Sequence, residues 1–177
     1  MTTTVRRATT DDAALLHELA ALTFGLACPP GTTQQVVDEF VATVLSETSF
    51  VGYLADPARA LLIAEVDGAP AGYTMLVFEE PRDPDVVAAI TVRPTAELSK
   101  VYVVEGHHGA GIGPALMSAS LDLAGERASV VWLGVNQHNA RANRFYEKNG
   151  FAIVGTKRFL VGGKFEDDFV RERVLAR

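Results

Sequence analysis

Three alternating glycines constrain the fold of this chain more than any other feature of its sequence. Gly109, Gly111 and Gly113 follow the apolar run 101–104 and form a turn that leads into a helix expected over residues 113–127. Glycine permits backbone angles that turn consecutive N–H groups toward one point. Such a nest at a helix N-terminus binds phosphate oxygens. A plain tight turn from strand to helix is the alternative interpretation, because short glycine motifs also occur by chance.

The spacing of these glycines excludes two familiar phosphate-binding loops. No Gly-Lys-Ser or Gly-Lys-Thr sequence follows, so the segment is not a Walker loop. The dinucleotide spacing Gly-x-Gly-x-x-Gly is also missing. Counted from Gly109 the last glycine comes one position early, and counted from Gly111 the position holds Ala115 or Leu116.

The apolar pattern on both sides of the glycines predicts a mixed α/β fold. A strand over 98–104, the helix over 113–127 and an almost wholly apolar strand over 129–135 form a βαβ unit, which we expect to be parallel and right-handed. Asp67 and Gly68 predict a hairpin turn. The remaining expected elements are a strand over 5–8, a helix capped by Thr9 or Thr10, a helix over 33–45, strands over 61–66 and 71–78, a loop over 79–95 with at most one short strand, a helix over 139–148, and strands over 151–161 and 165–174.

Length and composition narrow the class of protein further. The 177 residues, 48% of them hydrophobic and 21% charged, predict a single domain over 1–177. Cys28 is the only cysteine, no run reaches the roughly 20 apolar residues of a membrane helix, and the N-terminus lacks a signal-peptide core. We therefore expect a soluble, cytoplasmic protein without a membrane partner. The net charge of −6 disfavours nucleic acid as a partner and favours a cationic substrate.

Several segments, in sequence order, carry motifs of one known family. They are the hairpin with Ala71-Gly72-Tyr73, the strand segment 97–103, the glycine segment 108–113, and residues 139–151 with their Asn, Ala, Tyr, Gly and Phe spacing. In these segments the chain resembles the GNAT superfamily of N-acetyltransferases. The segment 97–103 and the ending 165–174 look most like bacterial members that acetylate polyamines and related small amines. The resemblance implies an α/β GNAT fold, with a central mixed, mostly antiparallel twisted sheet around a parallel βαβ core, flanked by helices.

The resemblance also implies an activity and a set of cofactor residues. The activity is acetyl-CoA-dependent transfer of an acetyl group to a primary amine of a small molecule or peptide, by direct attack of the amine on the thioester. A homodimer is left open as the oligomeric state. His108 and Pro114 depart from the family pattern, since the family usually has Arg or Gln at the first position and a free N–H at the second. Asn139 would contact the cofactor arm, with a helix N-cap as the alternative role. The implied cofactor-binding residues are Val101, Tyr102, Val103, His108, Gly109, Ala110, Gly111, Ile112, Gly113, Pro114 and Asn139.

Two residues are the candidates for proton transfer. Glu97 precedes the core strand where several family members carry their general base, and a surface carboxylate is the alternative interpretation. Tyr146 stands where a family phenol protonates the departing thiolate. Its alternative role is core packing, with Phe145 as the true core residue. No metal site is expected, because the adjacent His107 and His108 have no further ligand at a metal spacing.

Other interpretations of the function stay open at this stage. A CoA-binding module without catalysis needs only the glycine motif, and a nucleotide-binding regulator is disfavoured by the missing Walker lysine. The acceptor is expected at the variable loops 24–35 and 79–96. Carboxylates among residues 79–105 would attract a cationic amine there. Alternatively, these charges only solvate a loop.

Overall fold

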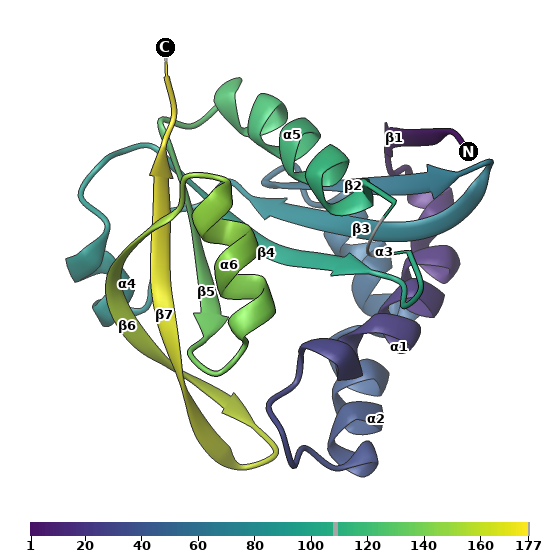
Figure 1. Ribbon diagram of the computed structural model, residues 1–177, viewed down its shortest axis with the longest axis horizontal. Helices are drawn as coiled ribbons and strands as arrows, with labels where there is room; N and C mark the ends of the chain where they lie inside the picture. Colours follow the sequence, from purple (N-terminus) through teal and green to yellow (C-terminus); the bar gives the residue numbers. More distant parts are fainter. Residues whose placement is uncertain (108–109, 177) are drawn as a thin grey trace. The chain divides into compact units, whose positions relative to one another are not determined.

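The computed structural model describes residues 1–107 and 110–176 (Figure 1). This part of the chain forms a seven-stranded sheet in the order β1-β2-β3-β4-β5-β7-β6, accompanied by helices, which is the mixed α/β fold that the sequence predicts. The elements are β1 (Thr3–Arg7), a 3-10 helix (Thr10–Asp12), α1 (Ala13–Ala27), α2 (Gln34–Thr43), α3 (Glu47–Ala55), β2 (Arg59–Val66), β3 (Ala69–Val77), α4 (Pro84–Ala89), β4 (Thr95–Val103), α5 (Ile112–Gly125), β5 (Val130–Asn136), α6 (Ala140–Lys148), β6 (Ala152–Val161) and β7 (Lys164–Val174).

The chain packs as two compact units. Unit 1 comprises residues 1–76 and 100–120, and unit 2 comprises residues 77–99 and the chain from Leu121 onward. The chain passes between the units at the end of β3, within β4 and within α5; the first residues of β4 belong to unit 2 and its last residues to unit 1. The single domain over 1–177 stays a prediction.

The β2–β3 hairpin of unit 1 forms at the turn that the sequence predicts. Asp67 has φ of 50° and Gly68 has φ of 84°, the positive values that a tight two-residue hairpin turn requires. Strand β1 pairs antiparallel with β2 on the other side. Arg6 of β1 donates two hydrogen bonds of 2.9 Å to the carboxylate of Asp12, so that this strand is tied to the start of α1.

The helices that follow differ from the sequence prediction of one helix over 33–45. Helix α2 begins after Thr33, whose side chain accepts a hydrogen bond from the amide of Val36, and it ends at Thr43. Helix α3 then begins after Ser46, whose side chain accepts a hydrogen bond from the amide of Ser49. Helix α3 was not expected from the sequence, although Ser46 carries the side-chain oxygen typical of a helix N-cap.

In unit 2, β4 and β5 form the parallel pair of the predicted βαβ unit. Residues 95–97 lie opposite residues 130–132 in parallel register. Strand β7 then pairs antiparallel with β5 on one side and with β6 on the other. In these registers Asp168 of β7 lies opposite Asn136 of β5 and opposite Lys157 of β6.

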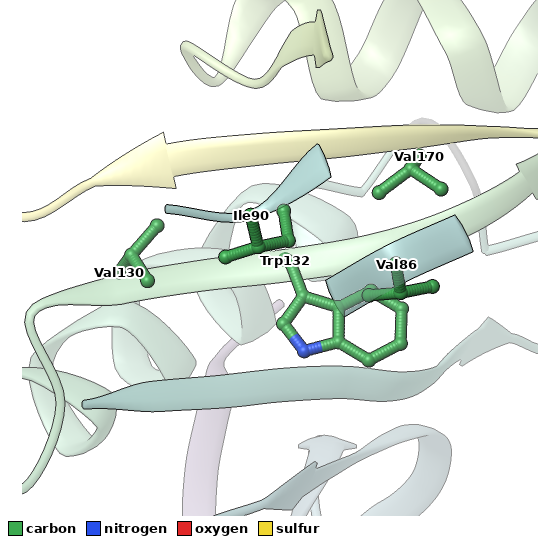
Figure 2. Close-up of a cluster of buried hydrophobic side chains, with 5 residues drawn as sticks. All are labelled: Val86, Ile90, Val130, Trp132 and Val170. Atoms are coloured by element: carbon green, nitrogen blue, oxygen red, sulfur yellow. The ribbon is translucent and has the colours of Figure 1, made fainter. Parts of the chain in front are cut away.

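Helix α4 covers one face of the unit 2 sheet. Trp132 is 6% exposed and packs in a cluster with Val86 and Ile90, which come from α4 and the residue after it (Figure 2). A Cβ atom at Gly155 of β6 would lie 2.8 Å from the Cβ of Ala89, so the glycine permits the close approach of α4. A loop was expected in this region, and α4 forms there instead.

Helix α6 is held to the other face of the same sheet. Arg171 of β7 donates from Nε to the side-chain oxygen of Asn143 at 3.1 Å, and from Nη1 to the carbonyl oxygen of Phe151 at 2.8 Å. Successive side chains of a strand point to opposite faces. Arg171 therefore faces α6, while its neighbour Val170 faces the cluster around Trp132.

Candidate functional site

The predicted cofactor strand, residues 101–103, forms the end of β4 in unit 1. All three residues are half-buried. A Cβ atom at Gly72 of β3 would lie 2.7 Å from the carbonyl oxygen of Tyr102 and 3.4 Å from the Cα of Val103. Gly72 is therefore required for the close backbone approach of β3 and β4 at this point.

The glycine turn leads directly into α5, as the sequence predicts. Gly111 has φ of 75°, in the left-handed region that favours glycine, and a Cβ atom there would meet nothing within 4 Å. Helix α5 begins at Ile112, which is fully buried, and the amide of Ala115 donates to the carbonyl oxygen of Gly111 at 3.1 Å. Pro114 is exposed in the first turn and has no N–H to offer.

The structure describes only part of the glycine segment 108–113. His108 and Gly109, two of the predicted phosphate contacts, lie outside the described residues. The amide of Ala110 donates to the carbonyl oxygen of His107 at 3.1 Å. Gly113 falls within the first turn of α5. A helix N-terminus leaves its first N–H groups without intrahelical partners, which is why phosphate groups bind at such turns; the phosphate contacts of this segment stay a prediction.

Glu97, the predicted base, lies in the part of β4 that belongs to unit 2. It is half-buried and stands opposite Trp132 of β5 in the parallel register. Trp132 in turn stands opposite Glu172 of β7, so that these side chains form one row on the same face of the sheet. Oxygen Oε2 of Glu172 and the indole nitrogen of Trp132 are buried and have no hydrogen-bond partner within the described residues.

Asn139 is the N-cap of α6. Its side-chain oxygen accepts a hydrogen bond of 3.0 Å from the amide of Ala142, and its carbonyl oxygen accepts one from the amide of Asn143. The alternative role of Asn139 as a helix N-cap is therefore confirmed. The contact of Asn139 with the cofactor arm stays a prediction.

Tyr146 lies on α6 with intermediate exposure. Burial raises the pKa of its phenol to about 12. Its ring is 5.6 Å from that of Phe145 and 6.0 Å from that of Phe151, measured between ring centroids. Phe145 was expected to be the core residue of this pair. It is only half-buried, however, and Phe151, at 1% exposure, fills the core instead.

The carboxylates of the predicted acceptor region are partly paired. Glu79 lies 3.5 Å from Arg82, and Glu80 forms an ion pair with Arg93. The side chain of Asp83 caps α4 by accepting a hydrogen bond of 2.9 Å from the amide of Asp85. These interactions offset part of the negative charge that the sequence analysis assigned to the region.

Histidine and cysteine side chains can act as metal ligands, and a cysteine thiolate can act as a nucleophile. Within the described residues, no group of three or more potential ligands could hold a metal ion. His17 is half-buried and its Nδ1 lies 2.8 Å from the carbonyl oxygen of Leu45, so it joins two segments of unit 1. Burial raises the pKa of the Cys28 thiol, which weakens it as a nucleophile.

Asp168 is a buried acid that the sequence analysis did not single out. It is 6% exposed, and burial raises its pKa to about 6. It belongs to the run Glu166-Asp167-Asp168, and nothing local to that run indicates which member is buried. The alternation along β7 could have divided the run between two faces, but only the register with β5 identifies the buried one.

The fold and the sequence match known proteins along most of the chain. The N-acetyltransferase paia of Thermoplasma acidophilum, solved in complex with coenzyme A, superposes with a TM-score of 0.78 at 18% identity, covering 99% of this chain and all of that chain. Salmonella typhimurium yncA, a protein described as a possible acetyltransferase and solved with acetyl-CoA, has a TM-score of 0.64 at 23% identity, covering 100% of this chain and 96% of that one. These structural similarities show that the chain has the GNAT fold.

Sequence similarity then gives the family. The family model described as acetyltransferase (GNAT) family matches residues 30–151. An uncharacterized N-acetyltransferase of Mycobacterium tuberculosis is 44% identical over 165 residues, which is 93% of this chain and 98% of the relative. The chain therefore belongs to the acetyltransferase (GNAT) family, and it is an acetyltransferase. Among the described residues, no helix is long and apolar enough to cross a bilayer.

Proposed function

We propose that this protein transfers the acetyl group of acetyl-CoA to a primary amine of a small molecule or peptide, by direct attack of the amine on the thioester. The observation that carries the proposal is the passage from the end of β4 through Gly111 into the N-terminus of α5, in a chain of the GNAT family. The solved structures with coenzyme A and acetyl-CoA support the same co-substrate.

The residues present fit this co-substrate. Gly111 has a positive φ and open space where a Cβ would stand, and it leads directly into the N-terminus of α5, the kind of turn at which phosphate groups bind. The pantetheine amides would pair with the backbone of residues 101–103 like an added strand, and Asn139 would contact the cofactor arm. The co-substrate supplies the activated acetyl group and leaves as a thiol.

Tyr146 is the proposed proton donor to the departing sulfur. A phenol whose pKa is about 12 stays protonated throughout the physiological range. The departing thiolate is the conjugate base of a thiol whose pKa is near ~8.5, so complete proton transfer from a phenol of pKa about 12 is uphill, and the phenol first stabilises the charge that develops on sulfur by donating a hydrogen bond to it. The role itself rests on the family motif that contains Tyr146.

The acceptor must lose a proton before it attacks, because an ordinary alkylamine has a pKa near ~10.4 and is charged at neutral pH. Glu97 is the base that the family motif proposes, and its half-buried place on β4 is compatible with that role. A cationic acceptor agrees with the net charge of −6. The ion pairs of Glu79 and Glu80 make the expected attraction modest.

A CoA-binding module without catalysis is the second candidate, because the turn from β4 through Gly111 into α5 would serve it without any catalytic side chain. An acceptor screen that follows free thiol release separates the two. The proposal expects release that requires an added amine and that fails in Tyr146→Phe. Binding of acetyl-CoA without amine-dependent release from any acceptor would favour the binding module.

A further inference from the structure

One buried arginine of β7 contacts helix α6 in its middle and just beyond its C-terminal end. Arg171 is 6% exposed. Its guanidinium donates from Nε to the side-chain oxygen of Asn143 at 3.1 Å and from Nη1 to the carbonyl oxygen of Phe151 at 2.8 Å. Asn143 lies within α6, and Phe151 follows the helix. A single side chain therefore holds this helix at two places.

The side chain of Asn143 extends the first of these contacts to the N-terminus of α6. Its Nδ2 donates to the carbonyl oxygen of Asn136 at 3.0 Å and to that of Asn139 at 2.9 Å. Its oxygen accepts the bond from Arg171, so the amide is bonded at both ends and has one favoured orientation. Asn143 thus ties the N-cap residue of α6 to the end of β5 and to β7.

The second contact leads to Tyr146. The amide of Phe151 donates to the carbonyl oxygen of Tyr146 at 3.0 Å, and the two rings pack edge to face. Asn139, Asn143 and Tyr146 stand at positions i, i+4 and i+7, which is the spacing of residues along one side of a helix. Arg171 is therefore connected, through one residue in each direction, to both α6 residues that have a proposed role in acetyl transfer.

A buried guanidinium is a costly way to attach a helix to a sheet. A charged group loses hydration free energy on burial, and apolar side chains of similar volume often stabilise a fold equally well or better. Both oxygens that Arg171 bonds here are neutral, so these two bonds lack the compensation that a carboxylate would give. What the guanidinium adds is geometry, because its rigid planar fork fixes its two acceptors relative to each other.

We propose that Arg171 is a positioning residue for acetyl transfer: through Asn143 it fixes Asn139 against the cofactor arm, and through Phe151 it fixes the phenol of Tyr146. The inference rests on the proposed function, in which Asn139 contacts the cofactor and Tyr146 donates to the departing sulfur. Every residue of this network belongs to unit 2. Arg171 acts only through its neighbours, so its loss displaces the two functional side chains without removing either.

The two branches predict different kinetic effects. Asn143→Leu breaks only the branch to Asn139, so the Kd of acetyl-CoA should rise about 10-fold, the order expected for one lost hydrogen bond. Its kcat for spermidine at saturating acetyl-CoA should stay near the wild-type value. Arg171→Met breaks both branches. It should raise Kd to a similar degree and also lower kcat by roughly 10- to 100-fold, because small misplacements of a reacting group have effects of that order.

Arg173→Met is the matched control. Arg173 also lies on β7, and its Nη1 donates to the carbonyl oxygen of Asn149 at 2.7 Å, so it too ties this strand to the end of α6. That bond involves neither Asn143 nor Phe151. Arg173→Met should lower the melting temperature while Kd and kcat stay near their wild-type values. If it changes both constants as much as Arg171→Met does, the effect is a general loosening of α6 and the inference is overturned.

A double-mutant cycle tests the route to the cofactor. Asn139→Ser keeps an oxygen that can cap the helix but removes the amide proposed to contact the cofactor arm. In that background Asn143→Leu should raise Kd much less than it does in the wild type, because the group that it positions is already gone. Equal effects of Asn143→Leu in the two backgrounds overturn the inference.

A readout on the wild type covers the case in which these variants do not fold. In nitrogen NMR, added coenzyme A should shift the side-chain amide signal of Asn143 and the Nε signal of Arg171 more than the Nε signal of Arg173. Equal or absent shifts overturn the inference. If the wild type binds no coenzyme A and releases no thiol with any amine, the proposed function fails. If it does both, and Arg171→Met and Asn143→Leu behave like the wild type, only this inference fails.

Discussion

The amide of Phe151 donates a hydrogen bond of 3.0 Å to the carbonyl oxygen of Tyr146, and the two rings meet edge to face at 67° with centroids 6.0 Å apart. This contact fixes the end of α6 against the start of β6. The phenol hydroxyl itself is not part of it. Packing of the ring and chemistry of the hydroxyl can therefore be separated by a single substitution.

Tyr146→Phe should lower kcat by roughly 10²–10⁴-fold while leaving the affinity for acetyl-CoA nearly unchanged. The substitution removes the proton donor but keeps the ring contacts with Phe145 and Phe151. Single-turnover kinetics and a binding titration check both parts. If the variant turns over at the wild-type rate, and chemistry rather than product release is rate-limiting, Tyr146 has only a structural role.

Gly111→Ala should abolish the rise in melting temperature that acetyl-CoA gives the wild type, a stabilisation of about 2.7 kcal/mol at a hundredfold excess over Kd. Gly31→Ala is the matched control, because Gly31 has φ of 87° and likewise open space around its Cβ position. Both variants suffer similar backbone strain. A shift that survives in Gly111→Ala, or disappears in Gly31→Ala, would contradict the proposed phosphate site.

The acceptor hypothesis predicts a salt dependence. For spermidine, kcat/KM should fall as ionic strength rises, because exposed charges are screened over about 8–10 Å at moderate salt. Neutralising Glu79 and Glu80 together should lower kcat/KM further, though modestly, since both are paired with arginines. Glu126→Gln, at an exposed position outside the predicted acceptor region, is the control. Acceptance of only neutral or acidic substrates would overturn the hypothesis and leave acetyl transfer intact.

Asp12→Asn should destabilise the protein in a pH-dependent way. The hydrogen bonds from Arg6 hold the pKa of Asp12 at about 2, below the ordinary value of 3.8. The ionised carboxylate therefore stabilises the folded state above about pH 4, and this stabilisation is lost as pH falls toward 2. Urea unfolding should show a loss of about 2 kcal/mol at pH 7 and a smaller loss at pH 3. Equal losses at both pH values would contradict the ion-pair account.

Local chemistry explains which parts of the fold could be predicted from the sequence. The hairpin follows from Asp67 and Gly68, whose backbone freedom determines the turn on its own. Helices α3 and α4 were missed because they are short and their signals are single capping residues, Ser46 and Asp83, which are equally common in loops.

The candidate site likewise has features that could be predicted from the sequence and features that could not. The N-terminus of α5 and the cap at Asn139 could be predicted, because a few consecutive residues create them. The buried state of Asp168 could not be predicted. It depends on Gly134 and Lys157, which come from two other strands and meet it only through the sheet register. No property of the segment around Asp168 determines that register.

The measurement that tests the account most directly is thiol release from acetyl-CoA by the wild-type enzyme across a panel of primary amines, with mass spectrometry of the amines. The account predicts release that requires a cationic amine, yields the singly acetylated amine in equal amount, and is lost in Tyr146→Phe. A wild-type protein that binds acetyl-CoA yet acetylates no amine of the panel would contradict the proposed function.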